Sequence, residues 1–169
     1  MTLTQLMAGH TPSASYAGWV TADDFVLAVD CGETPASSFA GAGSFAVAQV
    51  GVSSVDSELG PETQDKIYIR AGKSTLKTGN QRSFTVKADR CVGDAFQDFC
   101  LSHAVKYGTG SAVVRKYVYF DLLTGRGEKG EITILVESDG GGDAGEAARV
   151  EIELKKTGSA PESYTWSAQ

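Results

Sequence analysis

The chain has two histidines, His10 and His103, so catalysis through an imidazole base would depend on one of them. Cys100 precedes His103 by three residues, and residues at this spacing can share one face of a helix. A thiol beside an imidazole is a potential nucleophile, but such a pair needs an orienting third group, which the sequence does not reveal. No G-x-S-x-G motif is present to expose a serine nucleophile. We therefore interpret His103 as a helix-terminal residue and expect no catalytic residues and no enzyme activity.

Residues Gly72-Lys73-Ser74-Thr75 match the end of a phosphate-binding P-loop. The complete motif requires a second glycine five positions before Gly72, where this chain has Ile67 in an expected strand. We interpret the segment as a basic hairpin tip and expect no nucleotide there.

The sequence also lacks the ligand spacings of known metal sites. Asp139, Asp143 and Glu146 surround a run of glycines, but they lack the ligand order of an EF-hand, which favours a glycine-rich turn. The three cysteines have neither C-x-x-C spacing nor paired histidines, so we expect no zinc and no disulfide, only buried thiols. We expect no metal and no cofactor.

Charge is distributed unevenly along the chain. Residues 1–65 contain eight acids and no Lys or Arg, whereas seven bases and a single acid lie between Lys66 and Arg90. These segments either pair within one copy or join an acidic surface of one copy to a basic hairpin of another. Under the second hypothesis the candidate contacts between subunits are Arg70, Lys73, Lys77, Arg82, Asp56, Glu58 and Glu62. The net charge of −6 opposes tight binding to nucleic acid.

The elements that would position these residues are mostly strands. Period-two or β-branched segments predict strands at 25–29, 44–55 with a bulge at Gly51, 65–71, 83–89, 113–123, 131–138 and 149–155. One short helix is expected at about 94–105, with Asp94 as its N-cap. Residues 1–24 predict an N-terminal arm, and residues 25–169 a single domain with long loops at 31–44 and 72–81. The fold class is mainly β, an antiparallel β-sandwich or barrel with one flanking helix.

No basic segment precedes an apolar run at the N-terminus, and no stretch approaches 18 apolar residues. We therefore expect a protein that is made in the cytoplasm and is not membrane-bound.

The turns of the C-terminal half have a distinctive order. Residues 120–132 read F-D-L-L-T-G-R-G-E-K-G-E-I, a glycine-rich acidic turn follows at 140–146, and a charged alternating strand leads to Gly158-Ser159-Ala160-Pro161. Together with the short helix after a basic hairpin, this order resembles the tail tube (major tail) proteins of long-tailed bacteriophages. The resemblance covers Asp65–Ser163 and is a pattern of turns rather than a catalytic signature.

The resemblance implies a β-sandwich whose copies join edge to edge as hexameric rings, which stack into a hollow tube that delivers DNA into the host. It implies a virion tail protein made in the cytoplasm of a host bacterium, with tail terminator, tail-tip and tape-measure proteins as partners. The long loop, mapped to 72–81, and the arm, mapped to 1–24, would bridge rings. Related tubes occur in contractile tails and type VI secretion, so the kind of machine stays open.

DNA would pass through such a tube without specific binding, because a lumen lined by carboxylates repels the DNA phosphates. The lumen acids are either the outward residues of long strands, including Glu151 and Glu153, or the acidic loop with Asp56, Glu58 and Glu62. The alternative function is a monomeric or dimeric β-sandwich binding module of the adhesin or carbohydrate-binding type. Few loop aromatics support it, namely Tyr16, Trp19 and Trp166.

Overall fold

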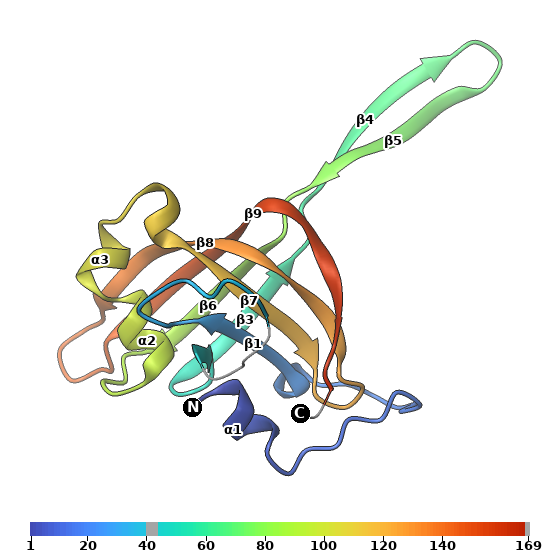
Figure 1. The fold of residues 1–169 in the computed structure, drawn as a ribbon. Coiled ribbons are helices and arrows are strands. Elements are labelled where there is room, and N and C mark those ends of the chain that lie inside the picture. The colour runs from blue at the N-terminus through green and yellow to red at the C-terminus, as the bar shows by residue number, and fades with distance from the viewer. Residues whose placement is uncertain (40–43, 168–169) are drawn as a thin grey trace.

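The structure is a computed structural model that describes residues 1–39 and 44–167. Its main feature is an antiparallel seven-stranded sheet that curls into a half-barrel (Figure 1), in the order β2-β1-β7-β8-β9-β6-β3. The strands of this sheet are β1 (Phe25–Asp30), β2 (Phe45–Val47), β3 (Val52–Glu58), β6 (Ser83–Asp89), β7 (Val114–Asp121), β8 (Arg126–Gly141) and β9 (Arg149–Thr165). The expected mainly β, antiparallel fold is confirmed.

Two further strands, β4 (Pro61–Tyr68) and β5 (Gly72–Asn80), pair only with each other in the described part of the chain. They form a hairpin that projects from one end of the curled sheet (Figure 1).

Alternating side chains build a core on each face of the sheet, as the pleat of a strand requires. On one face Leu27 and Val29 of β1 pack in one cluster with Phe84 of β6, Ile152 of β9 and Phe96, which lies in a short helix described below. Val150, Ile152 and Leu154 of β9 are all buried on this face, as their period of two predicts.

The opposite face is covered near β1 and β7 by the N-terminal segment. Thr2 and Gln5 form a capping box that starts α1 (Leu3–Met7), and Leu3 and Met7 are buried against Val26 and Phe120. The start of the expected arm therefore packs on its own sheet, because Leu3 and Met7 are four residues apart and lie on one face of α1. The rest runs along the surface through the 3-10 helix η1 (Ala22–Asp24).

The expected helix at 94–105 is instead two shorter helices, α2 (Ala95–Cys100) and α3 (His103–Lys106), followed by the 3-10 helix η3 (Gly110–Val113). Asp94 caps α2 as predicted, since its side chain accepts a hydrogen bond from the Gln97 amide at 3.0 Å. The break occurs because Ser102 has an extended backbone and acts as the N-cap of α3.

The segment 72–81 was expected to be a loop, but residues 72–80 form β5. The expectation is wrong because an alternation of apolar and polar residues marks a strand only when one of its faces is buried. Nearly every residue of this hairpin is exposed, so its strands show no such alternation. The chain reverses at Arg70 and Gly72, which both have positive φ, rather than farther along. Similarly, the expected acidic loop with Asp56, Glu58 and Glu62 is divided between the end of β3 and the start of β4.

Of the loop expected at 31–44, residues 40–43 lie outside the described residues. Asp30 organises its start, because its carboxylate accepts hydrogen bonds from the amides of Gly32 and Ala36. Among the described residues, no helix is long and apolar enough to cross a membrane.

Candidate assembly surfaces

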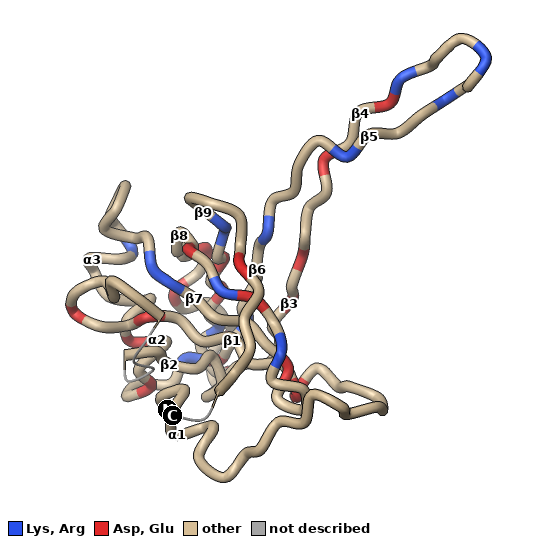
Figure 2. The backbone as a smooth tube through the Cα atoms, turned by 45° about the vertical axis from the view of Figure 1, so that its right-hand side comes forward, with Lys and Arg blue, Asp and Glu red and all other residues tan. Residues whose placement is uncertain are grey.

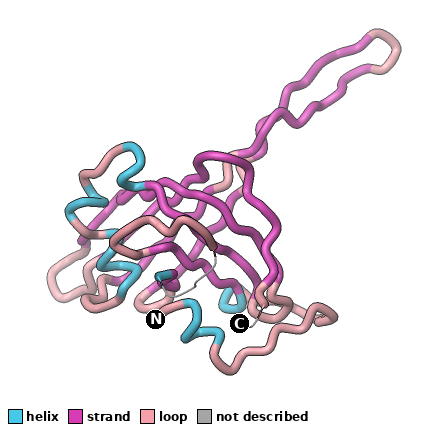
Figure 3. Tube along the Cα trace, viewed as in Figure 1, coloured by secondary structure: helices cyan, strands magenta, loops and turns pink. Residues whose placement is uncertain are grey.

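The β4–β5 hairpin carries most of the predicted basic contacts away from the body of the protein (Figures 1 and 2). Eight residues in β4 correspond to a projection of about 27 Å at the usual rise of a strand. Ile67 and Ile69 are 84% and 92% exposed near its tip. Figure 3 shows that strand geometry continues almost to the tip, and the two strands are paired from Pro61–Asn80 to Tyr68–Gly72.

The charges of the hairpin fall into two groups. The Lys73 ammonium lies 2.8 Å from an Asp65 carboxylate oxygen on the paired strand. That contact, together with a hydrogen bond from Thr75, lowers the pKa of Asp65. By contrast, Arg70 and Lys77 have no ion-pair partner among the described residues. Their charges are therefore open to a partner, whereas that of Lys73 is partly committed to its own hairpin.

Arg82 differs from the other predicted contact residues because its side chain is buried, with 6% exposed. Its Nε donates to Glu128 at 2.7 Å, and the Tyr117 hydroxyl donates to the same carboxylate at 2.9 Å. The guanidinium also lies over the Phe84 ring, 4.4 Å from its centroid. Burial raises the pKa of Tyr117, and the Glu128 charge raises it further. Arg82 thus fixes the base of the hairpin to β7 and β8.

The two alternative sets of lumen acids meet on one face of the sheet. Asp56 is opposite Thr85 in the β3–β6 register, and Thr85 is opposite Glu153 in the β6–β9 register. Residues in register share a face, so Asp56 and Glu153 lie on the same side, away from buried Ile152. Glu151 and Glu58 follow on that side of β9 and β3, and Lys87 and Lys155 neutralise part of the charge. Glu62 is separate, because it lies on β4 of the hairpin.

A cavity of about 560 Å³ lies where the two ends of the curled sheet approach each other. Residues of β1 and β2 line one side and residues of β3 the other. Its apolar lining consists of Leu6, Ala22, Phe25, Val26, Val47, Ala48, Val52, Val55, Tyr119 and Leu122.

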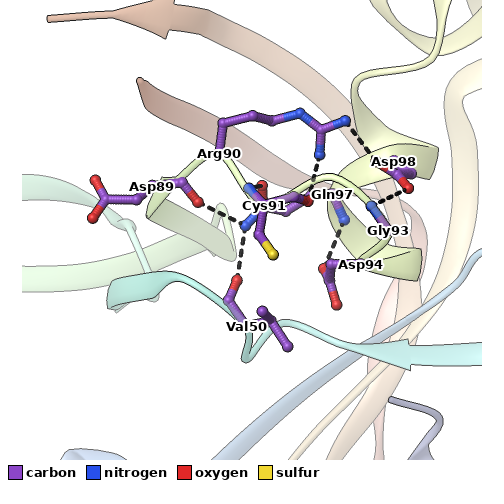
Figure 4. Close-up of polar contacts among 8 residues, drawn as sticks. All are labelled: Val50, Asp89, Arg90, Cys91, Gly93, Asp94, Gln97 and Asp98. Carbon is purple, nitrogen blue, oxygen red and sulfur yellow. Dashed lines mark hydrogen bonds and ion pairs between the residues drawn. The ribbon is translucent and has the colours of Figure 1, made fainter. Parts of the chain in front are cut away.

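The densest polar network surrounds α2 and its preceding loop (Figure 4). Buried Gln97 accepts from the Cys91 amide and donates to the carbonyls of Val50 and Asp89. Arg90 pairs with Asp98, and this pairing lowers the pKa of the Asp98 carboxyl. Gln97, Arg90 and Asp98 are thus satisfied, whereas Oδ1 of Asp94 is buried without a hydrogen-bond partner. The network ties two loops to the helix, which indicates a structural role.

The remaining chemical candidates have other environments. Cys100 is fully buried, and burial raises the pKa of its thiol, the opposite of what a nucleophile requires. His103 is exposed, and its ring lies against Tyr107 with centroids 4.8 Å apart. Asp139 and Glu146 are paired with Lys106 and Arg149. Within the described ranges, no three His, Cys, Asp or Glu residues are grouped to hold a metal ion.

The exposed apolar tip and the cavity were not singled out in the sequence. The alternation of Ile67 and Ile69 within a basic segment was the available signal for the tip. The sequence contained no signal for the cavity, because β1 and β3 approach each other only through the curl of the sheet.

The fold matches chains from two solved particles. The first is the tail of an empty gene transfer agent particle, solved by helical refinement with C6 symmetry: the TM-score is 0.58 at 16% identity, covering 88% of this chain and 100% of that chain. The second is the virion of a native gene transfer agent particle, with a TM-score of 0.58 at 14% identity, covering 87% and 100%. No protein-family model matches the sequence, and no curated protein matches it. The chain therefore has the fold of these particle chains.

Proposed function

We propose that this chain is a structural subunit of a phage-type tail tube, in which hexameric rings stack into a hollow conduit for DNA. The observation that carries the proposal is the fold, which spans the whole of the matched chain from a gene transfer agent tail. The C6 symmetry of that tail supports a ring of six copies. The turn pattern of residues 120–161 supports the same assignment independently of the fold.

The hairpin supplies the means to join copies. It projects from the sheet, it carries the unpaired bases Arg70 and Lys77, and its two strands stabilise little of the body. A head-to-tail contact between a projection and a distant surface builds rings or tubes rather than closed dimers. The predicted acidic contacts Asp56 and Glu58 lie on β3, an edge strand of the sheet, and the surface stretch of residues 9–24 is a second candidate bridge.

The acidic face formed by β3 and β9 is our candidate for the lumen. Glu151 and Glu153 of β9 are the lumen acids of this proposal; they lie on the side of the sheet away from Ile152, together with the predicted contact residues Asp56 and Glu58 of β3. Carboxylates facing a channel repel DNA phosphates and let the polymer slide without adsorbing.

In this role the protein needs no cofactor and performs no catalysis. It would occupy the virion tail after synthesis in a host bacterium, together with terminator, tail-tip and tape-measure partners. The nucleophile candidate Cys100 is buried, which supports a structural role.

The test is negative-stain electron microscopy of the purified protein over a concentration series, together with its mass from size-exclusion chromatography and light scattering. We expect rings or hollow tubes of uniform diameter with sixfold symmetry. A species that stays monomeric at the highest concentration, even after incubation with preformed tail tips, would overturn the proposal.

A further inference from the structure

The tip of the hairpin is an apolar feature that its own chain leaves uncovered. Ile67 is 84% exposed and Ile69 is 92% exposed, and the two lie within three residues on a projecting arm. Clustered apolar side chains on a protein surface mark interaction sites, whereas single ones are common and need no explanation.

The cavity between β1 and β3 is a recess of about 560 Å³ on the same molecule, lined by ten apolar residues together with Asp23, Gln49, Ser53, Ser54 and Ser57. Within the described chain β3 pairs only with β6, so its other edge is open beside this recess. An open strand edge next to a pocket with apolar side chains is a surface that accepts an extended segment of another chain.

The charges around the two features are opposite. Lys66 and Arg70 flank the isoleucines of the tip, and neither has an ion-pair partner in the described ranges. Asp23 lines the cavity, and none of the residues that line it is a base. Further carboxylates stand on its flanking elements, Asp24 on η1 and both Asp56 and Glu58 on β3.

The tip cannot fill the cavity of its own molecule. The hairpin extends about 27 Å, and its tip points away from the sheet (Figure 1). The complementary surfaces can therefore meet only between two copies.

We propose that Ile67 and Ile69 of one copy enter the cavity between β1 and β3 of a second copy. Lys66 and Arg70 then face the carboxylates that flank that cavity. This inference rests on the proposed tail tube and adds to it the receptor surface and the side chains that occupy it.

The first experiment compares the assembly of variants by sedimentation and electron microscopy. Replacing both isoleucines (Ile67→Ser with Ile69→Ser) should raise the protein concentration needed for assembly by at least about tenfold, because the apolar transfer free energy of two side chains is lost. The matched control is Leu76→Ser, since Leu76 is an exposed apolar residue of the same hairpin farther from its tip. We expect the control to assemble like the unmodified chain, and circular dichroism should show that all three proteins are folded.

The second experiment tests the location directly by disulfide formation between two partners that each carry one introduced cysteine. In a Cys91→Ser background, one protein carries Ile69→Cys and the other Ser53→Cys, a substitution in the lining of the cavity. Cys31 and Cys100 stay in place, because burial raises the pKa of both thiols and keeps them unreactive. The mixture should form a covalent dimer upon assembly, whereas Ile69→Cys mixed with Ser111→Cys, at an exposed site on η3, should not.

The outcomes separate the two proposals. If the unmodified chain forms tubes but the double serine variant assembles equally well and no cross-link appears, the docking is wrong and the tail tube stands. If the unmodified chain does not associate under any condition, both are wrong.

Discussion

Arg82 belongs to the base of the hairpin, and its side chain is engaged within the protein rather than presented to a partner. It forms an ion pair with Glu128 and packs over Phe84, so its charge is compensated inside the chain. Sequence reasoning had grouped it with Arg70 and Lys77 because composition shows the sign of a charge but not its burial. Its role as a contact between subunits stays a prediction, and its surroundings favour a role in stability.

We predict that Arg82→Ala lowers the free energy of unfolding by about 2–4 kcal/mol, because it leaves Glu128 partly buried without its cation. Urea denaturation followed by circular dichroism measures this change. Lys77→Ala removes an exposed base of the neighbouring hairpin and should change the free energy by less than about 0.5 kcal/mol. Equal stability of the two variants would contradict the prediction.

Cys31 leads to a second prediction at the residue scale. Burial raises the pKa of its thiol from 9.0 to about 12, and only the thiolate reacts with alkylating agents. At pH 8 the folded protein should therefore be alkylated at Cys31 about a thousandfold more slowly than the urea-unfolded chain, and the rate should rise about tenfold per pH unit up to pH 10. Mass spectrometry of iodoacetamide-treated protein measures both rates, and comparable labelling in the two states would refute this environment for the thiol.

At the scale of elements, the sequence predicted best those strands that have one buried face. The alternation of Val150, Ile152 and Leu154 located β9, and Asp94 located the start of α2. It failed for β5, whose Thr, Ser and Lys residues carry no hydrophobic period because neither face meets a core. It also could not reveal that Asp56 and Glu153 share a face, since the register through β6 is a long-range property.

The hairpin should be separable from the fold. The Gln81 amide donates to the Gly60 carbonyl at 3.0 Å, so a two-residue Asn-Gly turn can replace residues 61–80. We expect this variant to melt within about 2 °C of the unmodified chain, because the hairpin contributes little to the core. It should form no tubes. Differential scanning calorimetry and electron microscopy provide the two measurements, and a large loss of stability would show that the hairpin supports the body.

At the scale of the whole molecule, the charge divides between body and projection. The hairpin, residues 61–80, carries four bases and two acids, whereas the rest of the chain carries 11 bases and 19 acids. A positive arm thus extends from a body with a net charge of −8, which favours approach of the arm of one copy to the body of another.

This division predicts that salt slows assembly. Raising NaCl from about 0.05 to 0.5 M shortens the Debye length to a few ångströms and should slow tube growth by about tenfold or more. Light scattering after dilution of the salt measures the rate, and the variant without the hairpin should show no growth at either salt concentration. Growth that is independent of salt would indicate that charge does not steer the encounter.

The isolation of the two hairpin strands has a kinetic consequence. A two-stranded hairpin without a packed face is marginally stable by itself, so in a free monomer it will fray and expose Lys66, Arg70, Lys73 and Lys77 to trypsin. Each copy that joins the assembly loses conformational entropy when its arm becomes ordered. In the first small assemblies few contacts with neighbouring copies offset this loss. Growth should therefore show a lag that preformed ends abolish, and resistance to trypsin should appear in step with incorporation. The same ordering cost would delay association between newly made subunits until an existing end is ready to receive them.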